Sequence, residues 1–190
     1  MRCFGDGDPL YSEYHDREWG RPVVDERGLY ERLCLESFQS GLSWAIVLRK
    51  RASIRAGFRD FDPDRVARFG AEDIARLLAD PGVIRNRAKI EAAIANARAT
   101  RDLRDGDTPL EALVWSFRPP RRRAPRSFEG VAPFTPESKA LSAALKKAGF
   151  RFVGPTTAYA TMQAAGLVND HLAQCIVRAE VEREQAAVTR

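Results

Sequence analysis

Four scarce side chains that can bind metal ions stand at opposite ends of this chain. Its 190 residues include only two histidines and three cysteines. Cys3 and His15 lie near the N-terminus, whereas His171 and Cys175 lie near the C-terminus. The last two are four positions apart, and on a helix that spacing places both side chains on one face. A single ion bound by all four side chains would staple the two segments together.

The donor set of two thiols and two imidazoles suits zinc. Structural zinc sites are tetrahedral, and four protein ligands leave no open position for water or substrate. The separation of Cys3 from His15, however, is not a common zinc-finger spacing. Spacing alone therefore leaves an alternative open, in which Cys175 is a small apolar core residue and His15 a hydrogen-bonded helix residue. Cys34 stands between two leucines with no histidine nearby, and we interpret it as a core residue.

Length and composition favour a globular protein of the cytoplasm. A hydrophobic content of 44% is sufficient for a buried core, in one domain or two interlocked lobes. No apolar run approaches the roughly 18 residues of a membrane span, and no apolar segment follows the charged start. An odd number of cysteines argues against disulfides and for a reducing compartment. We expect one domain over residues 1–178, then a charged tail over residues 179–190 that frays beyond the helix carrying Cys175.

Helical patterns cover nearly the whole chain, and strand patterns are absent. Asp25 is placed to cap a helix that presents Leu29 and Leu33 on one face. Asp62 is placed to cap another helix, with Pro63 at its first position, where no N–H donor is needed. The same features recur in four further segments, and together they predict an all-α fold. These segments are residues 71–79, 86–99, 108–117 and 135–150.

The stretch LKKAGFRFVGPTTAYATMQAAG predicts two helices joined by a short turn. Gly149 ends the first helix, and Gly154 with Pro155 begins the second. Such a helix-hairpin-helix exposes backbone N–H groups that can hold a DNA phosphate without reading sequence. Two glycines also join many helix pairs that bind nothing, so both interpretations stay open. The candidate DNA-backbone residues are Lys147, Gly149, Arg151, Gly154 and Thr156.

Basic residues outnumber acidic ones by 31 to 26, which permits nucleic-acid binding without requiring it. Their densest cluster is SFRPPRRRAPRSF, residues 116–128, whose prolines predict a loop. This loop is either a solvated linker or an arm that contacts phosphates. Its arginines, all expected to point into solvent, are Arg118, Arg121, Arg122, Arg123 and Arg126.

A single carboxylate, Glu36, interrupts an otherwise apolar helix face in CLESFQSGLSW. A buried carboxylate without a partner is costly, so this one is exposed, paired with an arginine, or reserved for a ligand that donates hydrogen bonds. Aromatic residues gather nearby in the sequence: Tyr11, Tyr14 and Trp19 surround His15, and Trp44 follows Glu36. On pattern alone, the simpler interpretation places Glu36 on the surface and the aromatic residues in the core.

Four stretches occur in the order DPLYSEYHDREWG, LESFQSGLSW, VWSF and SKALSAALKKAGFRFVGPTTAYATMQAAGLVNDH. They closely resemble the bacterial 3-methyladenine DNA glycosylase I family, a zinc-containing branch of the helix-hairpin-helix glycosylases. The likeness extends from Cys3 to Cys175. It implies that Cys3, His15, His171 and Cys175 bind a structural Zn²⁺, which ties the N-terminal segment to the C-terminal helix.

The resemblance also implies the activity: a monomer that flips a nucleotide out of damaged double-stranded DNA and hydrolyses its N-glycosidic bond, releasing 3-methyladenine. A purine alkylated at N3 is cationic and already a good leaving group. Glu36 would be the catalytic carboxylate that accepts hydrogen bonds from the base and favours its cationic form. Stacking on the cation would fall to Tyr11, Tyr14, Trp19 and Trp44. Asp170 adjoins His171, and we assign it no catalytic role.

One stretch departs from the family. Where its members usually carry a tryptophan soon after the first cysteine, this chain reads CFGDGDPLY with Phe4, so one wall of the pocket is expected to differ. An alternative function is a zinc-stapled module that binds lesions without cleaving them, but such a module has no need of Glu36. A zinc hydrolase would need an open metal position, which four ligands exclude.

Overall fold

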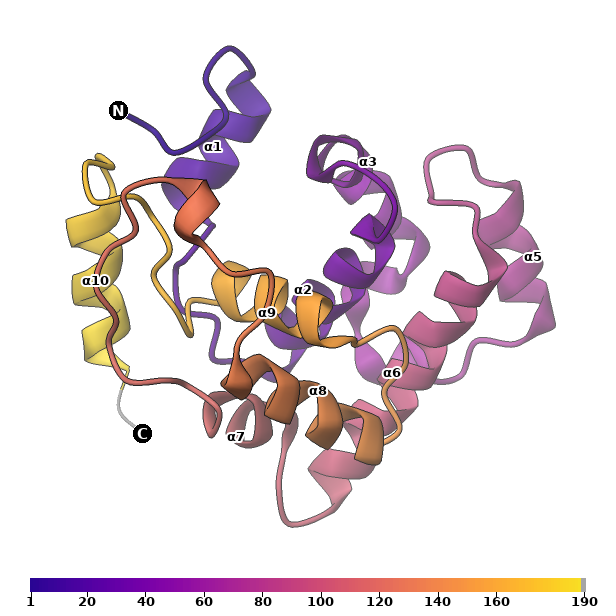
Figure 1. The fold of residues 1–190 in the computed structure, drawn as a ribbon. Helices are drawn as coiled ribbons and strands as arrows, with labels where there is room; N and C mark the ends of the chain where they lie inside the picture. Colours follow the sequence, from indigo (N-terminus) through magenta and orange to yellow (C-terminus); the bar gives the residue numbers. More distant parts are fainter. Residues whose placement is uncertain (189–190) are drawn as a thin grey trace.

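The computed structural model describes residues 1–188, and within that range all regular secondary structure is helical (Figure 1). This confirms the predicted all-α class. The elements are α1 (Pro9–Arg17), α2 (Glu26–Gln39), α3 (Trp44–Gly57), η1 (Arg59–Phe61), α4 (Pro63–Val66), α5 (Ala71–Ala79), α6 (Arg87–Asp105), α7 (Leu110–Trp115), η2 (Phe128–Gly130), α8 (Pro136–Lys147), α9 (Pro155–Ala164) and α10 (Arg178–Ala187), where η marks a 3-10 helix.

Local sequence signals set the ends of several helices. The Asp25 side chain accepts a hydrogen bond from the Gly28 N–H at the start of α2, as predicted. Asp62 caps α4, with Pro63 at its first position. None of the described helices combines the length and the apolar character needed to cross a membrane.

Helix α2 is the centre of the core. It packs against α3, α6, α7 and α9. Every residue from Leu29 to Phe38 is buried, so this helix has no solvated face over that stretch. Cys34 is 1% exposed, which confirms its interpretation as a core residue. Glu36 lies within the same run and is drawn into the interior by the apolar residues on both sides of it.

A tight turn joins α8 to α9. Gly149 has φ +96°, a conformation that favours glycine, and Gly154 precedes Pro155 at the start of α9, as predicted. Helix α6 holds this turn in place through Asn96. The Asn96 side chain accepts a hydrogen bond from the Arg151 N–H at 2.7 Å and donates one to the Arg151 carbonyl at 3.2 Å. Ser37, which adjoins Glu36 on α2, donates to a carbonyl of the same turn.

The C-terminal region differs from the prediction in two ways. His171 and Cys175 do not share a helix: they lie in consecutive turns between α9 and α10. The segment predicted to fray forms α10 instead, which begins at Arg178 and ends at Ala187. It is ordered because Val181 is fully buried and the Gln185 amide donates to two buried carbonyl oxygens. The last two residues of the predicted tail lie outside the described range.

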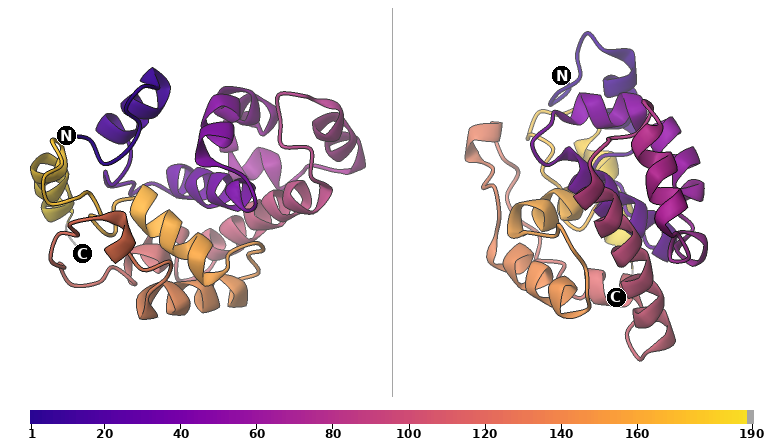
Figure 2. Two further views of the ribbon diagram at one scale, coloured as in Figure 1. Left: turned by 45° about the horizontal axis from the view of Figure 1, so that its top comes forward. Right: turned by 90° about the vertical axis from the view of Figure 1, so that its right-hand side faces the viewer.

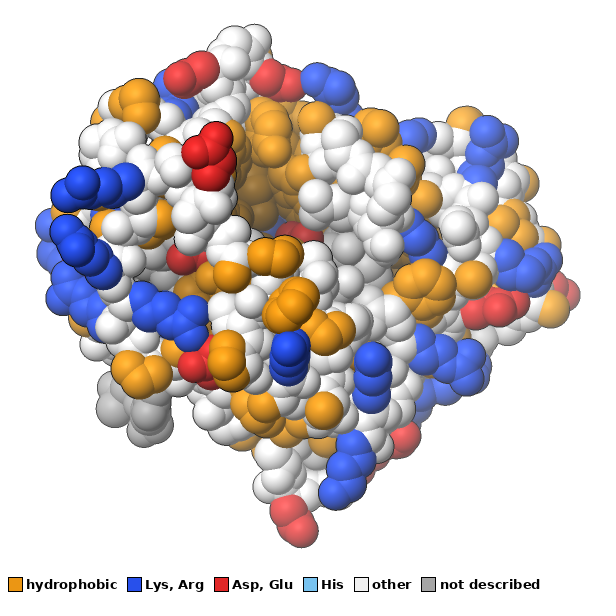
Figure 3. Space-filling model, viewed as in Figure 1, with side chains coloured by type: hydrophobic (Ala, Val, Ile, Leu, Met, Phe, Trp, Pro, Cys, Tyr) orange, Lys and Arg blue, Asp and Glu red, His pale blue; other side chains and the backbone are white. Residues whose placement is uncertain are grey.

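The two ends of the described chain lie on the same side of the molecule. The N-terminal segment runs beside α10 and the turns that precede it, as both turned views also show (Figures 1 and 2). The space-filling view shows a deep hollow between α1 and α3, lined by hydrophobic side chains (Figure 3). The N-terminal part of the chain, with α1, therefore borders this hollow, and the candidate site lies in this region.

Candidate functional site

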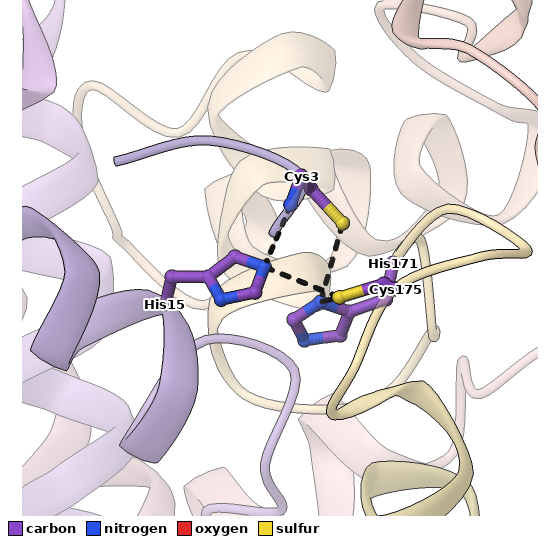
Figure 4. Close-up of side chains that lie close together, drawn as sticks. All are labelled: Cys3, His15, His171 and Cys175. Carbon is purple, nitrogen blue, oxygen red and sulfur yellow. Dashed lines mark hydrogen bonds between the residues drawn. The ribbon is translucent and has the colours of Figure 1, made fainter. Parts of the chain in front are cut away.

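Cys3, His15, His171 and Cys175 converge at one point, although their elements are far apart in the sequence (Figure 4). Their ligand atoms all lie within 4.8 Å of one another. The Cys175 sulfur lies 3.4 Å from His15 Nε2 and 3.4 Å from His171 Nδ1, and the Cys3 sulfur lies 3.6 Å from the same His171 nitrogen. The cluster is therefore a candidate metal centre with two sulfur and two nitrogen donors.

These separations fit a tetrahedral ion. With a zinc–sulfur bond of about 2.3 Å and a zinc–nitrogen bond of about 2.0–2.1 Å, tetrahedral angles put sulfur and nitrogen about 3.6 Å apart. The three sulfur–nitrogen distances of 3.4–3.6 Å match that value. His15, His171 and Cys175 are buried, so four protein donors surround a point that is shielded from water.

Hydrogen bonds to the outer ring nitrogens orient both histidines. His15 Nδ1 lies 2.8 Å from Asp16 Oδ1, and His171 Nε2 lies 3.0 Å from the Trp19 carbonyl oxygen. With those nitrogens protonated, the inner nitrogens carry the lone pairs that can bind an ion. In this structure the inner nitrogen of His15, Nε2, accepts a hydrogen bond from the Cys3 N–H at 3.2 Å. The adjacent Arg2 guanidinium, which hydrogen-bonds to Asp16, lowers the pKa of that carboxyl to about 2. The carboxylate therefore stays ionised and accepts a hydrogen bond from the His15 Nδ1–H group.

Burial also favours the ligand form of His171. It lowers the pKa of this imidazole to about 4, so the ring is neutral at neutral pH. The turn that carries both C-terminal ligands is held by Arg178, which donates to the carbonyl oxygens of Asn169, at 3.1 Å, and of His171. The i to i+4 spacing thus brings the two ligands together through turns rather than along a helix.

An aromatic wall connects the metal cluster to the interior. The Trp19 ring lies 4.6 Å from the His171 ring and 5.0 Å from Phe4, whose ring in turn lies 5.1 Å from Tyr11. The Tyr14 ring lies 6.5 Å from Phe4 and continues the wall. Phe4 therefore sits at its centre, so the stretch that lacks the expected tryptophan still supplies an aromatic ring.

The wall ends at Trp44, at the N-terminus of α3, whose ring lies 5.0 Å from Tyr14. Tyr14, Trp19 and Trp44 are all less than one-tenth exposed. The indole Nε1 of Trp44 is buried and has no hydrogen-bond acceptor among residues 1–188. An unsatisfied buried donor is rare in folded proteins, and next to a hollow it marks a place where a ligand can accept a hydrogen bond.

Glu36 is buried, with 6% of its surface exposed, which contradicts the interpretation that it is a surface residue. No hydrogen bond reaches its carboxylate from the described part of the chain. Burial raises the pKa of Glu36 to about 8, against a smaller opposing effect of Arg32. Burial raises the pKa of Tyr11 and of Tyr14, and the negative charge of Glu36 adds a smaller effect in the same direction, so both phenols lie near the carboxylate. The tyrosine part of the wall therefore borders an acid without a fixed partner.

Arg32 is a functional candidate that the sequence patterns did not indicate. It precedes Glu36 by one helical turn on α2, and one of its nitrogens donates to Glu18 at 2.9 Å. The other terminal nitrogen, Nη1, is buried without a partner in residues 1–188. Glu18 also pairs with Arg51. The only available signal was the i, i+4 spacing from Glu36, which many exposed arginines share.

The predicted DNA-backbone residues form a separate group at the end of α8 and the start of α9. Their side chains or backbones are exposed, except for Gly154, which is half-buried. The structure brings together Lys147, Gly149, Arg151, Gly154 and Thr156 around the α8–α9 turn. Asp170 is occupied elsewhere, because its carboxylate accepts from the Tyr159 hydroxyl at 2.6 Å and from the Gln163 amide at 2.8 Å.

Comparisons with known proteins point to one family. Residues 4–179 match the family model described as methyladenine glycosylase. The chain is 49% identical over 170 residues to DNA-3-methyladenine glycosylase 1 of Escherichia coli (strain K12), which covers 88% of this chain and 91% of that protein. A crystal structure of 3-methyladenine DNA glycosylase I aligns with a TM-score of 0.90 at 48% identity, covering 93% of this chain and 98% of the other.

A further solved structure is that of a 3-methyladenine DNA glycosylase I variant, with phenylalanine in place of a tyrosine, in complex with 3-methyladenine. It aligns with a TM-score of 0.88 at 33% identity, covering 93% of this chain and 96% of the other.

Proposed function

The chain belongs to the methyladenine glycosylase family, and on that basis we propose that it is a DNA repair enzyme that excises 3-methyladenine from alkylated DNA. The reaction is hydrolysis of the N-glycosidic bond. The observation that carries the proposal is Glu36, a buried carboxylate without a hydrogen-bond partner in the described chain, beside an aromatic wall. A pocket of this kind suits a flat cationic base that donates hydrogen bonds.

The chemistry requires recognition more than catalytic force. A base methylated at N3 carries a positive charge in DNA, and this charge already weakens its bond to deoxyribose. Binding of the cationic base stabilises the ionised form of Glu36, whose negative charge in turn attracts the base, and stacked aromatic rings add about 0.5–2 kcal/mol for a cation. Normal adenine is neutral and gains neither contribution, so the same pocket selects the damaged base. Flipping the nucleotide out of the duplex brings the base to this pocket.

We assign Zn²⁺ to the Cys3, His15, His171 and Cys175 cluster, as a structural ion. When bound, it would crosslink the two ends of the chain. With four protein ligands it would have no open coordination position. The chain's own residues then perform the recognition: Trp19 is held against His171 on one side and lines the aromatic wall on the other. Four protein ligands argue against a zinc hydrolase, which needs an open metal position. Because all four ligands come from one chain, the site needs no second copy, and we propose that the protein acts as a monomer.

The direct test is to incubate the protein with methylated duplex DNA and to identify the released base by chromatography and mass spectrometry. We expect free 3-methyladenine and intact strands containing abasic sites. Binding of methylated DNA without release of any base would instead support the non-cleaving lesion-binding module.

Trp44→Phe should weaken the binding of free 3-methyladenine by about tenfold, as expected for one lost hydrogen bond worth about 1.4 kcal/mol. The substitution keeps an aromatic face but removes the unpartnered Nε1 donor. Calorimetric titration with the free base measures the effect. Trp115→Phe is the matched control, because its indole donates to the Val23 carbonyl at 2.9 Å and should affect stability only. Equal affinity of the Trp44 variant and wild type would mean that the ligand does not use this donor.

Gly154→Val should weaken DNA binding uniformly across sequences and leave binding of free 3-methyladenine unchanged. The residue has φ −63°, and a Cβ added there would meet nothing within 4 Å, so the variant should fold normally. The added bulk would instead obstruct a phosphate that approaches the free N–H groups at the start of α9. Titration with duplexes of several sequences checks this prediction. Unchanged affinity would show that the α8–α9 turn has only a structural role.

A further inference from the structure

The basic segment over residues 116–128 is attached to the protein at several points. Four of its five arginines are exposed, as predicted, whereas Arg118 is half-buried. Arg118 donates to the carbonyl oxygens of Gln185 at 2.5 Å and Val188 at 3.3 Å, and its guanidinium lies 5.5 Å from the centre of the Trp115 ring. This arginine therefore anchors the start of the segment to the end of α10.

Two more arginines and one backbone bond hold the middle of the segment. Arg121 pairs with Glu182 of α10 at 2.6 Å, and Arg122 pairs with Glu137 of α8 at 2.6 Å. The Pro125 carbonyl accepts from the Ala173 N–H at 2.8 Å, within the turns that carry the C-terminal metal ligands. The segment is thus a fixed part of the surface rather than a solvated linker.

Arg123 and Arg126 do not take part in this anchoring. Both are exposed, and neither forms an ion pair or a hydrogen bond with any residue of the described chain. The acidic residue nearest to them in the sequence is Glu129, which is exposed as well. Two permanently charged guanidinium groups on a rigid, proline-rich segment lose less conformational entropy on binding a ligand than they would on a flexible loop.

The same segment leads directly to the aromatic wall. Phe128, two residues after Arg126, is 41% exposed, and its ring lies 6.2 Å from Phe4 and 6.3 Å from Trp19. Because a chain advances at most about 3.6 Å per residue, the backbone at Arg126 lies within about 7 Å of that at Phe128. The ribbon view places η2 and the α8–α9 turn on opposite sides of α9 (Figure 1). The space-filling view shows basic side chains on the same face as the hollow (Figure 3).

We propose that Arg123 and Arg126 form a second phosphate-contacting surface, which grips the DNA strand on the side of the hollow opposite the α8–α9 turn. This inference rests on the proposed function, because it takes the hollow as the place where a flipped nucleotide enters. Arginine suits the role, since its planar guanidinium binds phosphate oxygens in pairs. Contacts on both sides of the flipped nucleotide help to offset the few kcal/mol that unstacking requires.

The test is a salt titration of duplex binding by the double variant Arg123→Gln, Arg126→Gln. Each lost phosphate contact lowers the slope of log affinity against log salt by about 0.9, so the slope should fall by about 1.8. Between 50 and 200 mM salt, wild type should therefore lose about tenfold more affinity than the variant does. Binding of free 3-methyladenine should be unchanged, because in this proposal the two arginines contact only phosphates of the DNA backbone.

Two matched variants separate a local contact from a general charge effect. Arg123→Lys, Arg126→Lys keeps both charges and should keep most of the salt slope. The double variant Arg65→Gln, Arg68→Gln removes the same amount of charge from a different place: Arg65 lies in α4 and Arg68 just after it, and both are exposed. Helix α4 packs against α6 and η1, and this variant should leave the salt slope unchanged. The proposal would be overturned if the variant Arg123→Gln, Arg126→Gln kept the wild-type salt slope. It would also be overturned if the α4 variant lost as much of the slope as that variant does.

The outcome is distinguishable from failure of the proposed function. If wild type releases no base but the slope still falls in the double variant, the phosphate surface stands and the glycosylase assignment fails. If wild type releases 3-methyladenine and the slope is unchanged, the function stands and this surface is wrong.

Discussion

Replacing Cys175 with alanine should remove the bound metal ion and lower the midpoint of thermal unfolding by more than about 10 °C. For a chain of this length, 1 kcal/mol of stability corresponds to about 2–4 °C. The lost ion is worth several kcal/mol, because structural zinc contributes directly to folding. The donors come from both ends of the chain, so loss of the ion removes the metal crosslink and leaves weaker contacts, such as the hydrogen bond from the Leu172 N–H to the Cys3 sulfur at 3.1 Å.

The measurement is metal analysis of freshly purified protein together with thermal unfolding. Wild type should carry one zinc ion per chain, and the Cys175→Ala variant none. The surviving folded fraction of the variant should still release base at low temperature, because Glu36 and Trp44 lie on α2 and α3, which carry none of the four metal ligands.

Cys34→Ala is the matched control. This cysteine is 1% exposed in α2 and belongs to the apolar core rather than to the metal cluster. Its substitution should cost about 1 kcal/mol, typical of a small cavity, and leave the zinc content unchanged. Wild type without zinc, or equal losses in the two variants, would contradict the assignment of a structural metal centre.

Much of the helical framework could be predicted from local sequence, because the interactions that set helix ends are local. Asp25 and Asp62 bond to backbone groups two or three residues away, so their side chains mark where α2 and α4 begin. The Gly149 and Gly154 turn was equally readable from the chain alone. Helix α10 was not, because its burial depends on Val181 and Gln185 meeting residues far away in the sequence.

The candidate site was predictable in its residue types but not in its geometry. The four metal donors were visible as scarce residues, yet the sequence suggested that His171 and Cys175 share a helix. Turns bring them together because Arg178 fixes the carbonyl groups between α9 and α10. The burial of Glu36 likewise depends on four helices packing around α2, which no local pattern reports.

Phe4 and Phe128 show the same limit for specificity. Because this chain has Phe4 and lacks the tryptophan that family members usually carry after the first cysteine, part of the pocket wall was expected to differ from that of the family. In the structure its ring contacts those of Tyr11 and Trp19, and Phe128 adds a further ring from the basic segment. The wall is therefore assembled from three distant parts of the chain, and only the folded arrangement reveals that Phe128 belongs to it.

Glu36→Gln should abolish most base release and yet raise the stability of the free protein at pH 8. The folded-state pKa of Glu36 is about 8, well above the ordinary value of a glutamate. Between pH 4.5 and 8, the folded protein therefore holds a proton that the unfolded chain has released. Wild-type stability falls as pH rises through this window, by up to about 1.4 kcal/mol per pH unit from this group. Glutamine does not titrate, so the variant should escape this loss.

The difference in unfolding free energy between variant and wild type isolates Glu36 from the other titrating groups, which both proteins share. It should be near its minimum below pH 4.5, grow through pH 6.5 and be largest at pH 8, measured by urea unfolding at each pH. Burial raises the pKa of the neighbouring Tyr11 and Tyr14 further above this window, so these two phenols do not change charge within it.

Glu31→Gln on the same helix is the control of opposite sign. Glu31 is also buried, but its carboxylate accepts from Arg51 at 2.9 Å and lies 3.7 Å from Arg55. Its neutralisation takes one of the two carboxylate partners from Arg51, which keeps only Glu18, and should destabilise the protein. If the Glu36 variant were instead less stable than wild type at pH 8, the carboxylate would already be satisfied in the free protein. It would then have no need of a cationic base. A stabilised variant that no longer releases 3-methyladenine would mean that the fold tolerates a costly buried acid because recognition of the damaged base requires it.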